Sequence, residues 1–149
     1  LQTMAYGYRA AWTTLDTYCL RFRRERKVYN IRTIIARWAP PSENDTDAYV
    51  RAVVRLSGLG GNENIPRPNR YRNFERLEKT ARLLAAMTCV ECGIPWKEVD
   101  WEAIWQGYEL AYPGRLEAAK AEKARKASPL QLEDLSVWDE YEDWSAMDC

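Results

Sequence analysis

Apolar side chains recur every three or four positions through the first two dozen residues of the chain. Between about Thr3 and Arg26, the positions that share this spacing are Tyr8, Ala11, Trp12, Leu15, Tyr18, Cys19 and Phe22. Because an α-helix completes a turn in about 3.6 residues, this spacing places them all on one face. The pattern predicts a long amphipathic helix, and its basic C-terminal end complements the negative end of the helix dipole.

A double proline and a polar bend separate the next two predicted helices. Asn30 is a favoured N-cap residue, and Pro40 and Pro41 end the helix that it starts, because proline cannot continue a helix and disfavours helical geometry at the residue before it. The cap-forming segment 42–47 then starts another helix. The apolar face of that helix comprises Tyr49, Val50, Val53, Val54 and Leu56. We therefore predict that residues 38–50 form a rigid elbow between two amphipathic helices.

Glycine and proline mark the ends of the remaining predicted helices. The GLGG segment at 58–61 ends one helix, and a polar, proline-broken loop follows it. Helical spacing returns from Asn73 to Glu91 and again after the cap residue Asp100, until Pro113. Because no segment shows the period-two alternation of a β-strand, the predicted fold class is mainly α, a small helical bundle with a C-terminal extension.

The composition changes at Gly114, which divides the chain into a helical domain (1–113) and an extension (114–149). The first part of the extension is rich in alanine and lysine with almost no apolar stripe, so we expect a solvated helix standing away from the body. The part after Pro129 is acidic with interspersed apolar residues: Leu130, Leu132, Leu135, Val137, Trp138, Tyr141 and Trp144. This tail would dock either onto the chain's own basic first helix or onto another subunit, giving a homo-oligomer.

The overall composition excludes several classes of protein. The 149 residues fit one domain, and 22 basic residues balance 22 acidic ones, so neither disorder nor a uniformly charged binder is indicated. The absence of histidine excludes Ser-His-Asp and Cys-His catalysis. Cys89 and Cys92 have redox or zinc spacing but no second pair, so we expect two partly buried helix thiols, and neither a metal nor a cofactor. The sequence contains no apolar run that would span a membrane and no signal peptide.

Basic residues gather at the end of the first predicted helix. The cluster comprises Arg21, Arg23, Arg24, Arg26 and Lys27. A solvated helix end accounts for such a cluster. The alternative is a contact with phosphate groups, as in a nucleic-acid packaging factor, and this is the less favoured hypothesis.

Several segments together resemble a known family. GYRAAWTTLDTYC at 7–19, NIRTIIARWAPPSENDTDAYVRAV at 30–53, LSGLG and AAMTCVECG are similar to bacteriophage and prophage virion structural proteins, over about residues 5–93. The resemblance implies a helical, phage-derived protein of the virion or bacterial cytoplasm, lysozyme-like and acting on or near peptidoglycan. In that family an NPGNIR-type segment normally precedes the GYRA helix. Only six residues precede Gly7 here, and they do not contain such a segment. If the family's catalytic acid is in that segment, this chain is expected to be inactive.

The elbow carries the residues best suited to glycoside hydrolysis. Glu43, Asp45 and Asp47 lie close together, and such hydrolysis uses a protonated carboxylic acid with a second carboxylate nearby. A carboxylate at a helix N-terminus has its pKa lowered, which suits the second role but not the first. The flanking residues expected to contact a ligand are Trp38, Asn44, Thr46 and Tyr49. Capping and loop rigidity are the alternative roles of this segment.

The sequence thus favours a non-enzymatic or degenerate phage structural protein that recognises a partner surface, either peptidoglycan or another virion protein. The alternative is a muramidase-like peptidoglycan hydrolase that uses Glu43 with Asp45 or Asp47. The tryptophans at helical spacing are expected to serve mainly in packing rather than as sugar platforms: Trp12, Trp38, Trp96, Trp101 and Trp105.

Overall fold

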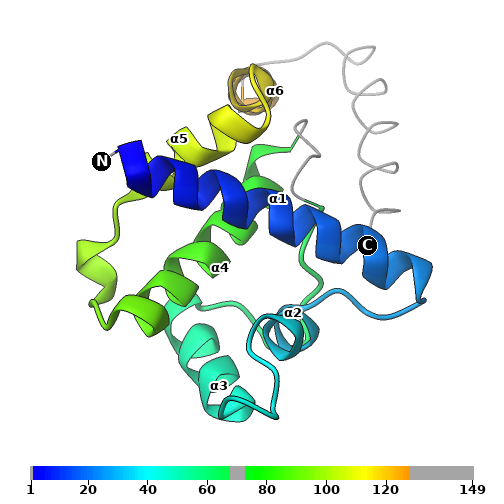
Figure 1. Cartoon of the computed structure of the whole chain (residues 1–149). Coiled ribbons are helices and arrows are strands. Elements are labelled where there is room, and N and C mark those ends of the chain that lie inside the picture. Colours follow the sequence, from blue (N-terminus) through cyan, green and yellow to red (C-terminus); the bar gives the residue numbers. More distant parts are fainter. Residues whose placement is uncertain (1, 68–72, 128–149) are drawn as a thin grey trace.

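The N-terminal helix α1 (Gln2–Arg24) lies across the molecule and packs along helix α5 (Trp101–Ala111), as Figure 1 shows. The structure is a computed structural model, and it describes residues 2–67 and 73–127. Trp12 is fully buried between the two helices, and its indole Nε1 donates a hydrogen bond to the carbonyl oxygen of Ile104 at 2.9 Å. The predicted apolar stripe of the first helix is therefore the face that forms the core.

A glycine allows α1 and α5 to approach closely. A Cβ atom added at Gly107 would lie 2.5 Å from the Cβ of Tyr8 and 2.7 Å from the backbone nitrogen of Arg9. Real Cβ atoms essentially never lie so close to backbone or Cβ atoms. The contact between the two helices therefore requires a residue without a side chain at position 107.

Helix α2 (Ile31–Trp38) begins at the predicted cap. The Asn30 side chain accepts a hydrogen bond from the backbone N–H of Thr33, and the Thr33 hydroxyl accepts one from the backbone N–H of Asn30, which forms a capping box. The hydroxyl of the buried residue Tyr29 donates to the carbonyl oxygen of Leu15 at 2.9 Å. These bonds fix the connection between α1 and α2.

Helix α4 (Phe74–Cys92) occupies the centre of the bundle and contacts α3 (Thr46–Ser57), α5 and α6 (Arg115–Ala127). Asn73 caps its N-terminus, and Gly93 ends it in the left-handed conformation, with a φ of 65°. Its buried residues are on more than one face: Leu77, Thr80, Ala81, Leu83, Leu84, Ala85, Ala86, Met87 and Cys89. A short 3-10 helix, η1 (Trp96–Glu98), connects α4 to α5. Because neighbours cover α4 on several sides, it holds the bundle together.

Helix α6 (Arg115–Ala127) corrects one expectation from the sequence. It does not stand away from the body, because it packs against α4 and α5 and buries Leu116 and Ala119 in the common core. A leucine and small alanines are enough to form a contact face, since alanine allows a neighbouring helix to approach closely. The acidic tail after Pro129 lies outside the described residues, so its docking onto the basic first helix or onto another subunit stays a prediction. The domain boundary at Gly114 stays a prediction.

The predicted mainly α fold class is confirmed. The described ranges 2–67 and 73–127 contain helices, one short 3-10 turn and an isolated bridge between Asn30 and Asn64, but no strand. Within these same ranges, every helix is too short or too polar to cross a membrane.

Candidate functional site

The segment between α2 and α3 forms the predicted elbow, and hydrogen bonds to its own backbone hold it. The Thr46 hydroxyl donates to the carbonyl oxygen of Ala39 at 2.6 Å, and the Asn44 side-chain amide donates to the carbonyl oxygen of Pro40 at 3.3 Å. The Asp45 carboxylate accepts from the backbone N–H of Ala48 at 3.0 Å and so caps α3. Two of the four predicted ligand contacts, Asn44 and Thr46, thus stabilise the turn itself.

The three candidate catalytic acids are all exposed on this elbow. Asp45 is engaged as the N-cap. The side chains of Glu43 and Asp47 make no hydrogen bond or ion pair with any residue that the structure describes. One of the three acids therefore caps α3, and the other two are left in solvent.

We expect Asp45→Ala to lower the free energy of unfolding by about 0.5–2 kcal/mol, because the amide of Ala48 loses its acceptor. Chemical denaturation followed by far-ultraviolet circular dichroism measures this change. Asp45→Asn is the matched control, since asparagine caps about as well as aspartate. An alanine variant as stable as the wild type would contradict the capping role.

The other two predicted contacts, Trp38 and Tyr49, converge on a residue that the sequence did not single out. The Tyr49 hydroxyl donates to Glu91 Oε1 at 2.9 Å, and Trp38 Nε1 donates to the same oxygen at 3.2 Å. Burial, followed by the hydrogen bond to Glu91, raises the pKa of Tyr49 above its usual range, so this hydroxyl keeps its proton at neutral pH. The carboxylate of Glu91 thereby joins the ends of α2 and α4 to the start of α3.

A groove of about 270 Å³ lies beside this junction, between α1 and the C-terminal half of α4. Its walls are almost entirely apolar. The lining residues that form the walls are Met4, Gly7 and Ala11 from α1, Leu84 and Met87 from α4, and Trp38. Across the groove, the hydroxyls of Tyr8 and Thr88 hydrogen-bond to each other at 2.8 Å. Its lining resembles that of ligand sites, which are mostly apolar with a few fixed polar groups.

Three further tryptophans in the described part of the chain, Trp96, Trp101 and Trp105, pack against the core. Trp96 and Trp101 pack edge to face with their ring centroids 5.3 Å apart, and Trp105 stacks on Phe74 at 5.4 Å. These half-buried rings line a hollow of about 310 Å³ that also includes Glu78 and Arg82. They pack against the core cluster, as the sequence predicted for them.

The basic cluster is at the exposed end of α1 and in the turn after it. All five of its members are exposed, and Lys27 pairs with Glu25 at 3.3 Å. Nearby, the guanidinium of Arg37 lies 5.4 Å from the ring centroid of Tyr18. This arrangement is consistent with a solvated helix end, and the phosphate contact stays a prediction.

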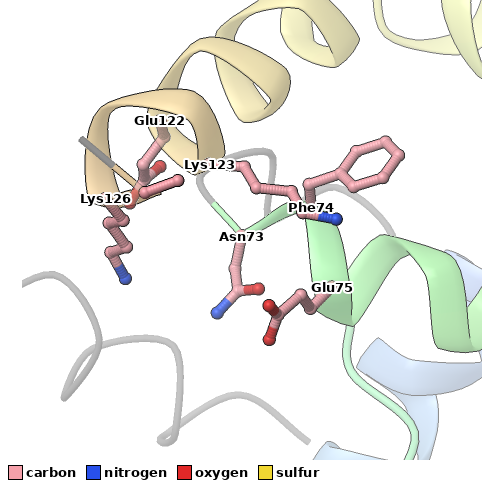
Figure 2. A pocket seen from close by; sticks show the side chains of 7 residues that line it. Asn73, Phe74, Glu75, Glu122, Lys123 and Lys126 are labelled. Atoms are coloured by element: carbon pink, nitrogen blue, oxygen red, sulfur yellow. The ribbon is translucent and has the colours of Figure 1, made fainter.

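Two further features have no assigned role. A hollow of about 280 Å³ lies between the start of α4 and α6. Figure 2 shows Lys123 extending toward Phe74, with its Nζ 5.0 Å from the ring centroid, whereas Lys126 points away from that ring. Cys89 is buried and Cys92 is exposed, both as free thiols on the last turn of α4. Within residues 2–67 and 73–127, no three acidic, cysteine or histidine side chains are placed to hold a metal ion.

Part of the chain is similar to a known phage protein. It is 38% identical over 64 residues to Protein P5 of Pseudoalteromonas phage PM2, a match that covers 43% of this chain and 38% of the phage protein. The chain thus corresponds to about two fifths of that relative. No described protein family matches the chain, and no solved structure does. The similarity supports a phage-related protein.

Proposed function

We propose that this protein is a phage-derived structural protein that acts by binding other proteins, as a component of the virion. The similarity to Protein P5 of phage PM2 is the observation that carries the proposal. The elbow supports it too, since Asp45, Thr46 and Asn44 fix its shape and Trp38 and Tyr49 are bound to Glu91. Most side chains expected to hold a ligand are therefore engaged within the fold.

The second candidate function is a lysozyme-like peptidoglycan hydrolase. The free carboxylates of Glu43 and Asp47, both exposed on the elbow, favour it. General acid catalysis, however, needs a carboxyl group that stays protonated near neutral pH, usually because burial raises its pKa. An exposed carboxylate on an open bend lacks that environment, so we prefer the structural role.

A turbidity assay separates the two functions. The wild-type protein is expected to leave a suspension of purified, peptidoglycan-containing cell walls turbid, while a known muramidase clears it. Glu43→Gln is expected to behave like the wild type and to keep its melting temperature, because the Glu43 side chain makes no hydrogen bond or ion pair with the described residues. If the wild type clears the suspension and Glu43→Gln does not, the protein is a hydrolase that uses Glu43.

Purified phage particles provide the test of the structural role. We expect mass spectrometry of purified phage particles from a strain that carries this gene to detect the chain, and detection should persist after a high-salt wash. A chain found only in the lysate and never in particles would contradict a virion component.

A further inference from the structure

The groove between α1 and α4 is open to solvent and ready to receive a side chain. Met4 lines one wall with 41% of its surface exposed, whereas Leu84 and Met87 on the other wall belong to the buried core. A Cβ atom added at Gly7 would meet nothing within 4 Å, so the space above this glycine is empty within the described part of the molecule. Exposed methionines suit surfaces that bind partners, because their flexible side chains adapt to irregular shapes.

Glu91 supplies charge at the edge of this groove. It is the one charged side chain among the described residues that line it. Its Oε1 receives both hydrogen bonds, from Trp38 and Tyr49, while its Oε2 makes no bond to the described residues. The carboxylate is thus held in one orientation with an acceptor still available, and no lining residue that the structure describes neutralises it.

The charge and shape of the groove select the kind of occupant. A carboxylate beside apolar walls complements an apolar side chain that is followed by a cationic one. The chain's own segment after Pro129 has the wrong charge, since it contains acidic residues from Glu133 to Asp148 and no lysine or arginine. Grooves between two helices commonly receive one face of a third helix.

We propose that this groove binds a basic amphipathic helix of a partner protein, with an apolar side chain of the helix over Gly7 and a lysine or arginine on Glu91. The inference rests on the proposed role in protein binding and names the chemistry of the partner. Apolar burial between the helix and the walls gives most of the affinity, and the ion pair fixes the orientation.

The test uses the full chain and a fluorescein-labelled Leu/Lys amphipathic peptide of about 15 residues, long enough to form a helix on binding. Fluorescence anisotropy measures its dissociation constant. Gly7→Leu fills the groove and is expected to weaken binding about tenfold or more, because it displaces a buried apolar side chain. Ala10→Leu is the matched control, since Ala10 is on the same helix, exposed and outside the groove, and it should bind as the wild type does.

The charge is tested separately. Glu91→Gln keeps an acceptor for Trp38 and Tyr49 but removes the negative charge, so we expect binding to weaken about two- to fivefold and to depend less on salt. Glu117→Gln is the control for net charge, because it removes one negative charge at an exposed position on α6. A peptide with glutamate in place of lysine should bind more weakly than the basic one.

Two results would overturn the inference: equal binding by Gly7→Leu and Ala10→Leu, or equal binding of the basic and acidic peptides. Circular dichroism verifies that Gly7→Leu is folded, which is expected because its side chain meets open space. These failures are distinct from failure of the proposed function. Clearing of cell walls would contradict the structural role, regardless of the peptide result. Peptide binding that Gly7→Leu does not weaken would contradict only the assignment of the groove.

Discussion

Replacing Trp12 by alanine is expected to lower the free energy of unfolding by about 3–5 kcal/mol, because it leaves a large cavity between α1 and α5. Trp12 is fully buried, and its ring centroid lies 4.8 Å from that of Tyr108 and 5.8 Å from that of Trp105. Domains of this size have a total stability of about 5–15 kcal/mol. The variant should therefore be marginally folded at room temperature.

Denaturant unfolding followed by circular dichroism measures the loss. Trp12→Phe separates the packing of the indole ring from its hydrogen bond. It keeps much of the apolar volume but leaves the Ile104 carbonyl oxygen without the donor that lies at 2.9 Å in the wild type. We expect it to be destabilised by less than the alanine variant. A loss below about 1 kcal/mol for Trp12→Ala would mean that α1 and α5 do not pack through this residue.

Gly107→Ala is expected to destabilise the protein by about 1–3 kcal/mol, the usual range for overpacking in a tight interior. Elsewhere in a helix the same change is favourable by about 0.5–1 kcal/mol, because alanine has the higher helix propensity. At position 107 the new methyl group would overlap the backbone of α1 at Tyr8 and Arg9. The two helices would have to move apart.

Gly7→Ala is the matched control for this prediction. Gly7 is also inside a helix, but its added methyl group would meet nothing within 4 Å. We expect the melting temperature to rise slightly for Gly7→Ala and to fall by several degrees for Gly107→Ala. A rise for both variants would show that helix propensity, and not the close approach of α1 and α5, decides both.

Local signals in the sequence predicted helices α2 to α5 well, because each of these helices has its own cap and apolar period. Asn30, Asn73 and Asp100 were all identified as N-caps or helix starts, and each one accepts a backbone hydrogen bond there. Pro40 and Pro41 end α2 and Asp45 begins α3, so the elbow is confirmed where it was predicted. These features depend on only a few neighbouring residues.

The candidate site was harder to predict, because it joins residues that are distant in the sequence. The partner of Trp38 and Tyr49 is Glu91, which is 53 and 42 positions away along the chain. On its own helix Glu91 looks like an ordinary exposed residue near the C-terminus. The contact face of α6 was missed for a related reason, since its few apolar residues matter only once α4 and α5 lie opposite them.

The pairing of the first helix with α5 has a consequence for synthesis on the ribosome. Trp12 donates its hydrogen bond to a residue 92 positions later. At about 5–20 residues per second, the partner of α1 is made only about 5–20 s after α1 itself. During that interval Trp12 lacks the surface of α5 that covers it in the folded protein, so newly made chains should depend on chaperones that bind the apolar face of nascent α1.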